Sequence, residues 1–178
     1  FRKPLVLMTP KSLLRHKRCV SKLSEFGPGS SFHRVLWDDA EILPDQKIKL
    51  VPDKEIKRVV LCSGKVYYDL YEERERRGIN DIYLMRVEQL YPFPAKSLMT
   101  ELACFPDAEF VWCQEEPKNM GAWFFMEPNI EWVLDHLGTR YRRASYVGRS
   151  ASAATAAGLI SKHNQELNQF LSEALRID

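Results

Sequence analysis

From residue 58 onward, strand-like and helix-like segments alternate, and this alternation constrains the fold more than any other feature. Predicted strands span residues 58–62 (RVVLC), 82–87, 109–113 and 141–147, and predicted helices span residues 66–77, 95–104, 129–137 and 163–175. The first strand is continuously apolar, which is typical of a strand buried on both faces of a parallel sheet. The sequence therefore predicts an α/β fold, with a mostly parallel sheet and helices on both of its faces.

The first 57 residues are less regular and are predicted to form an N-terminal lobe of the same domain. Residues 5–8 (LVLM) are a predicted strand, residues 11–26 one or two short helices, and residues 27–31 a loop. Residues 32–37 fit an edge strand, and the polar stretch 38–57, with Pro44 and Pro52, fits a surface excursion. A length of 178 residues suits one domain, 1–178, in which residues 58–178 are the regular α/β part. Because Phe1 stands almost directly before an apolar strand, we expect a fragment of a larger chain.

Charge, cysteine and histidine patterns exclude several classes of function. The 26 Lys and Arg against 24 Asp and Glu give a net charge of +2, and the basic segments are not interleaved with aromatic residues, so we expect no nucleic-acid or membrane partner. Four cysteines without CxxC spacing are predicted to be small core residues in a reducing compartment: Cys19, Cys62, Cys104 and Cys113. Four histidines lack the spacing of metal ligands: His16, His33, His136 and His163.

The carboxyl ends of the predicted strands are the places to seek a ligand, because open parallel sheets bind ligands there. Ser63-Gly64-Lys65 joins a strand to a helix, where free backbone N–H groups and the helix dipole attract anions. The alternative is a Ser63 N-cap followed by a turn glycine. Arg149 follows Gly148 and precedes small residues, which leaves room for a ligand.

Two further clusters have a functional and a structural interpretation. Lys11 and Ser12, in a basic segment where a helix begins, fit phosphate binding, or else a solvated helix face. Glu115 and Glu116 fit the acid/base pair of a glycosidase-like hydrolase, but adjacent strand residues point to opposite faces, so pairing with an arginine or a backbone N–H is favoured. No nucleophile elbow or dinucleotide motif is present, and we predict no catalytic residue in this chain.

Several long blocks resemble the C-terminal region of 2-oxoglutarate dehydrogenases, in the thiamine-diphosphate-dependent, decarboxylating component. They are residues 2–5 (RKPL), 9–16 (TPKSLLRH), 63–70 (SGKVYYDL), 86–94 (RVEQLYPFP) and 112–117 (WCQEEP). The resemblance covers essentially the whole chain. It implies a transketolase C-terminal-like domain in a homodimer, inactive when isolated, with thiamine diphosphate and Mg²⁺ held by upstream domains of the same chain.

The same resemblance implies partners and a regulatory site. The full enzyme would pass a succinyl group to a lipoyl-bearing succinyltransferase component, in a bacterial cytoplasm or a mitochondrial matrix. Some members of the family bind acetyl-CoA or an adenine nucleotide such as AMP. Matching the motifs places such a ligand near six residues: Thr9, Lys11, Ser63, Lys65, Gln114 and Arg149.

Three positions depart from the family pattern. Met120 stands where Gln is common, Ser150 where Pro is common, and Lys17 replaces a frequent Pro. These departures put the regulatory site in doubt but not the fold. A second hypothesis for the whole chain is a stand-alone module that binds CoA or an adenine nucleotide.

Overall fold

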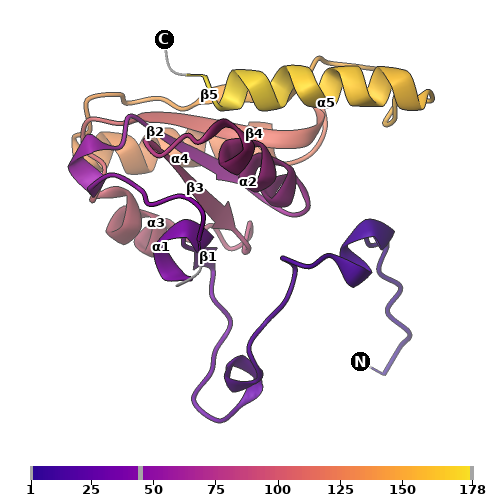
Figure 1. The fold of residues 1–178 in the computed structure, drawn as a ribbon, viewed down its shortest axis with the longest axis horizontal. Coiled ribbons are helices and arrows are strands. Elements are labelled where there is room, and N and C mark those ends of the chain that lie inside the picture. Colours follow the sequence, from indigo (N-terminus) through magenta and orange to yellow (C-terminus); the bar gives the residue numbers. More distant parts are fainter. Residues whose placement is uncertain (1, 44–45, 177–178) are drawn as a thin grey trace. The chain divides into compact units, whose positions relative to one another are not determined.

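The computed structural model describes residues 2–43 and 46–176, and it forms two compact units (Figure 1). The first unit, Phe1–Phe32, contains two 3-10 helices, Lys11–Arg15 and Leu23–Phe26. The second unit, His33–Asp178, contains the sheet and all the α-helices. Residues 33–57, assigned from the sequence to an N-terminal lobe, belong to this second unit. Phe1 and Pro44, which entered the sequence predictions, lie outside the described residues.

The predicted mostly parallel sheet is confirmed, with the strand order β1-β3-β2-β4-β5. Strands β2 (Arg58–Cys62), β3 (Ile82–Val87), β4 (Glu109–Pro117) and β5 (Ser145–Arg149) are paired in parallel, and β1 (Val35–Leu36) runs antiparallel to β3 at one edge. All five residues of β2 are buried, as its continuous apolar sequence predicts.

Helices cover both faces of the sheet, as predicted. Helix α2 (Val66–Arg77) contacts α5 (Ile160–Ala174), whereas α3 (Ala95–Leu102) contacts α4 (Trp123–Leu137). Because successive strand residues point to opposite faces, Leu61 and Trp112 pack with α3 and α4 in the largest core cluster, and the intervening residues face α2 and α5. A short helix, α1 (Asp39–Ile42), and a 3-10 helix, Asp53–Glu55, precede β2.

The predicted strand at residues 5–8 is wrong for this chain. Leu5 to Met8 have no regular secondary structure, and their exposed fractions run from 71% to 93%. Four apolar side chains in water offer no burial to offset the entropy of ordering a strand.

Element ends shift where the sequence gives no clear stop signal. Strand β4 continues to Pro117, so Gln114 and both glutamates lie within it, and β5 covers Gly148 and Arg149. Helix α4 begins six residues earlier than predicted despite Pro128, and α5 begins three residues earlier. Gly78 and Gly138 are the predicted C-caps, but Lys65, rather than Ser63, is the N-cap of α2.

Cysteine burial follows position in the sheet. Cys62 and Cys113 are buried and face each other in the register of β2 and β4, as core residues should. Burial raises the pKa of the Cys62 thiol to about 12 and raises that of Cys113 as well, so both stay protonated at neutral pH. Cys104 is exposed and Cys19 half-buried, so the prediction that they are core residues is wrong.

A buried ion pair ties the segment before β2 to the sheet. Arg74 and Asp38 are both 0% exposed, and Arg74 Nη2 donates to Asp38 Oδ1 over 2.7 Å while its Nη1 donates to Oδ2. The same carboxylate accepts from the backbone N–H groups of Leu84, at 2.7 Å, and Ala40, at 2.8 Å. Asp38 thus links α1, α2 and β3, in a stretch that the sequence alone placed in a surface excursion.

Replacing Arg74 should therefore be costly. We expect Arg74→Leu to lower the free energy of unfolding by about 3–5 kcal/mol, because it leaves the buried Asp38 carboxylate without its counter-charge. Urea unfolding of the chain measures this change. The matched control is Arg76→Leu on the same helix, whose side chain is 70% exposed and whose loss should cost less than about 1 kcal/mol. Equal losses for the two variants would contradict the assignment.

Candidate functional site

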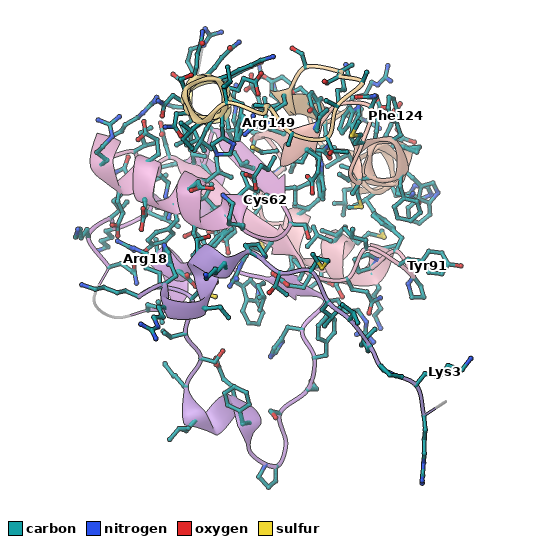
Figure 2. All side chains as sticks on the ribbon, turned by 90° about the vertical axis from the view of Figure 1, so that its right-hand side faces the viewer. Lys3, Arg18, Cys62, Tyr91, Phe124 and Arg149 are labelled. Atoms are coloured by element: carbon teal, nitrogen blue, oxygen red, sulfur yellow. The ribbon has the colours of Figure 1, made fainter. Side chains whose placement is uncertain are left out.

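Arg149, at the carboxyl end of β5, is held in place by contacts from β4 and α5 (Figure 2). Its Nε donates to the Glu115 carbonyl oxygen over 2.9 Å, Nη1 pairs with the Glu166 carboxylate, and Nη2 lies 2.9 Å from His163 Nδ1. The guanidinium also lies over the ring of Phe170, 5.9 Å from its centroid. Helix α5 therefore holds this arginine in place through three side chains.

Two small cavities flank Arg149. One, of about 230 Å³, lies between the end of β5 and α5, and the other, of about 140 Å³, is bounded by the loop after β5. Arg149, Ser150, Lys162 and Glu166 line both cavities. Each is smaller than the usual pocket for a drug-sized ligand, so either cavity would accommodate only part of a nucleotide.

Lys65 is tied to the same region through Glu115. Its Nζ lies 2.6 Å from Asp69 Oδ2, one helical turn away, and 3.5 Å from Glu115 Oε1. Burial lowers the pKa of the Lys65 ammonium, but the hydrogen bond to Asp69 and the charges of Asp69 and Glu115 outweigh this and raise it. Lys65 is therefore a fixed cation, and Glu115 connects it to Arg149.

The Gln114 side chain lies on the face of the sheet that α4 covers, and it makes hydrogen bonds within the chain. Its Oε1 accepts from the Trp112 indole N–H, at 2.9 Å, and from the Trp123 backbone N–H at the start of α4, at 3.0 Å. Its Nε2 donates to the Met120 carbonyl over 2.7 Å. The amide thereby satisfies a backbone N–H that the helix leaves free, and the loop carbonyl next to it.

Two glycines allow the close packing around Gln114. A Cβ on Gly121 would lie 2.9 Å from Gln114 Nε2, and the φ of Gly121 is +67°, a conformation that L side chains rarely adopt. A Cβ on Gly148 would lie 2.6 Å from the Gln114 carbonyl oxygen and 2.5 Å from the Tyr146 hydroxyl. A larger residue at Gly148 would require a shift of β4 or β5, and one at Gly121 would displace the Gln114 amide.

The other predicted site residues lie at the end of β2 and in the first unit. Ser63 is half-buried directly after β2, and Gly64 beside it is exposed. Thr9 and Lys11 lie in the first unit, where Lys11 begins a 3-10 helix, and both are exposed. Within the second unit the structure therefore brings together Lys65 and Arg149, and it turns the Gln114 side chain toward α4.

Sequence reasoning missed the anionic partners of the two cations. Glu166 and His163 lie three residues apart, as neighbours on one face of α5, and this spacing was a usable signal. Glu115 does not form an acid/base pair with Glu116, because its carboxylate is held by Lys65 while the Glu116 side chain is exposed. Among residues 2–43 and 46–176, no three His, Cys, Asp or Glu side chains are grouped so as to hold a metal ion, and no helix is long and apolar enough to cross a bilayer.

An exposed aromatic cluster lies at the start of α4. Tyr91 is 81% exposed and Phe124 62% exposed, and Figure 2 shows both on one side of the second unit. The Phe125 ring is 6.3 Å from that of Tyr91 and 6.4 Å from that of Phe93. These four residues are called the aromatic cluster below.

Comparison with known proteins gives a consistent result. The family described as 2-oxoglutarate dehydrogenase C-terminal matches residues 20–175. The chain is 65% identical, over 175 residues and 98% of its length, to proteins named 2-oxoglutarate dehydrogenase E1 component from Brucella anthropi, Brucella ovis and Brucella canis. It covers 18% of the first of these proteins and 17% of the other two, and so spans less than a fifth of these relatives.

The bonding of Gln114 predicts a stability cost for its loss. We expect Gln114→Leu to lower the free energy of unfolding by about 1–3 kcal/mol, because the Trp112 and Trp123 N–H groups stay buried without an acceptor. Urea titration followed by tryptophan fluorescence measures the change. Glu116→Gln, with an exposed side chain two residues away, should change stability by less than about 0.5 kcal/mol. A Gln114 variant as stable as this control would show that the amide bonds are dispensable.

Proposed function

The chain belongs to the 2-oxoglutarate dehydrogenase C-terminal family, and from this we propose that it is the C-terminal domain of a 2-oxoglutarate dehydrogenase E1 component. The observation that carries the proposal is the family match over residues 20–175, joined to 65% identity with proteins more than five times as long. The single domain 1–178, with its lobe and its regular part, is proposed as the terminal part of that longer enzyme.

The proposed activity belongs to the whole enzyme. Such an enzyme would decarboxylate 2-oxoglutarate with thiamine diphosphate and Mg²⁺ and pass the succinyl group to the lipoyl-bearing succinyltransferase component. The described residues do not fit a Mg²⁺ site, since no three of their His, Cys, Asp or Glu side chains are suitably grouped. We therefore assign cofactor binding to other domains and derive no catalytic step from this chain. The relatives named above are bacterial, which favours a bacterial cytoplasm, and the mitochondrial matrix stays a prediction.

The role that we propose for this domain in the enzyme is structural, in a homodimer. The aromatic cluster supports that role, because apolar surface rimmed by polar residues is characteristic of protein interfaces. The second hypothesis from the sequence, a stand-alone CoA- or nucleotide-binding module, is not supported by the comparisons, since the matching proteins are E1 components.

A regulatory role rests on the cations at the carboxyl ends of the strands. We propose that acetyl-CoA or AMP binds there through its phosphate, with Arg149 and Lys65 as the cations and with Thr9, Lys11, Ser63 and Gln114 as the other positions implied by the resemblance. Arg149 already has the Glu166 carboxylate as its counter-ion. A phosphate would therefore have to displace Glu166, and binding would be an exchange of one anion for another. Ser150, one of the departures, lines both cavities beside Arg149.

Grafting tests the parentage directly. We expect a Brucella anthropi E1 component, in which this chain replaces the matching 175 residues, to keep decarboxylation of 2-oxoglutarate that depends on thiamine diphosphate. The isolated chain should give no turnover under the same conditions. Ferricyanide reduction coupled to decarboxylation measures both. A folded graft without activity, or turnover by the isolated chain, would refute the proposal.

Calorimetry of the grafted enzyme with acetyl-CoA and with AMP tests the regulatory site. We expect Arg149→Gln to weaken binding at least about tenfold, through loss of a charge-assisted contact, and Glu166→Gln to strengthen it, because the competing carboxylate is gone. The matched control is Arg140→Gln, an exposed arginine outside both cavities, which should leave affinity unchanged. No heat with either ligand, or weaker binding in Glu166→Gln, would count against the site.

A further inference from the structure

Residues 5–8 (LVLM) combine a strand-like sequence with a lack of any partner strand. Their side chains are between 71% and 93% exposed. Within residues 2–43 and 46–176, no backbone hydrogen bond involves any of the four. Both the apolar side chains and the peptide groups of this segment are therefore left to water, an arrangement that native proteins avoid in ordered apolar segments.

We propose that this segment is a strand added to the edge of a β-sheet formed by the polypeptide that precedes this chain in the full-length enzyme. The inference rests on the proposed function, in which the chain is the C-terminal part of a longer protein. The partner is thus a sheet edge with apolar pockets on both faces, because the segment is apolar at every position rather than at alternate ones.

The segment lies before the part of the chain that the family model matches. The family match starts at residue 20, whereas the alignment with the long Brucella proteins covers 98% of the chain and so takes in most of the residues before it. The compact unit that holds the sheet starts later still, at His33. Residues 5–8 therefore lie outside both the matched region and the compact unit that holds the sheet.

Local sequence favours strand addition over a helix or a tight turn. Pro4 and Pro10 bound the segment, and every residue between them keeps its N–H for a ladder hydrogen bond. Thr9 is restricted to an extended conformation because it precedes a proline, and Pro10 itself is extended, with ψ of 115°. Val6 is β-branched, and Leu5, Leu7 and Met8 give it apolar neighbours on both sides.

Hydrogen exchange in the full-length enzyme tests the proposal. We expect the amides of residues 5–8 to exchange at least about 100-fold more slowly than those of the loop at residues 27–31, because ladder hydrogen bonds must open before exchange. Equally fast exchange in the two segments would overturn the proposal, since it would make residues 5–8 an unpaired linker. Decarboxylase activity measured on the same preparation reports separately on the proposed function.

A pair of proline variants identifies the partner. Val6→Pro removes one ladder donor and should abolish protection both in residues 5–8 and in one strand upstream of this chain. Val20→Pro is the matched control: Val20 is 75% exposed against 80% for Val6, lies outside the strand-like run, and should leave both protections intact. The proposal would be overturned if Val6→Pro instead removed hydrogen-exchange protection in β1, in β5 or at a subunit contact. The segment would then pair with a different partner strand. If Val6→Pro fails to fold, the exchange rates of the unsubstituted enzyme still decide.

Discussion

The ion pair between Asp38 and Arg74 is the interaction on which the arrangement of the second unit depends. It joins α2 to β3 and fixes the segment that follows β1, while the Tyr83 hydroxyl accepts from the Asp38 N–H at 3.1 Å and the Tyr67 hydroxyl accepts from the Asp39 N–H at 3.1 Å. A charge in such a place is tolerated only when it is paired with an opposite charge and hydrogen-bonded. The antiparallel edge strand β1 is thus anchored by electrostatics as well as by its two-residue ladder.

The carboxyl ends of the strands show the opposite use of charge, because the cations there are half-buried and balanced. Lys65 is paired with Asp69 and Glu115, and Arg149 is paired with Glu166. These ion pairs let the region stabilise the fold without a ligand. On the other face of the same strand, Gln114 uses its amide to join β4 to the start of α4, so the alternation of the strand gives its two faces different polar contacts.

The sequence predicted the parallel sheet, its strands and most of its helices, because apolar runs and glycine C-caps are local signals. It failed for Asp38, since the buried pair joins residues 36 positions apart and a polar residue in a proline-containing stretch is usually exposed. It also failed for residues 5–8, whose pattern was that of a strand although no partner strand exists in the described chain. Of the site, Lys65 and Arg149 were located from their positions at strand ends. Two of the carboxylates that hold them, Glu166 on α5 and Glu115 near the end of β4, make contacts that only the tertiary structure shows, whereas Asp69 lies one helical turn from Lys65.

Cys62 and Cys113 sit on adjacent strands at the centre of the sheet, under α2 and α5, and this position has a chemical consequence. Both thiols are sealed from solvent and kept protonated, so alkylating reagents and peroxides reach them only when the strands or the covering helices separate. The pKa of the Cys104 thiol is also raised, by partial burial and nearby carboxylates, but this thiol is exposed and reagents can reach it in the native state. The difference in labelling rate between Cys104 and the two buried cysteines therefore reports how often the middle of the sheet opens.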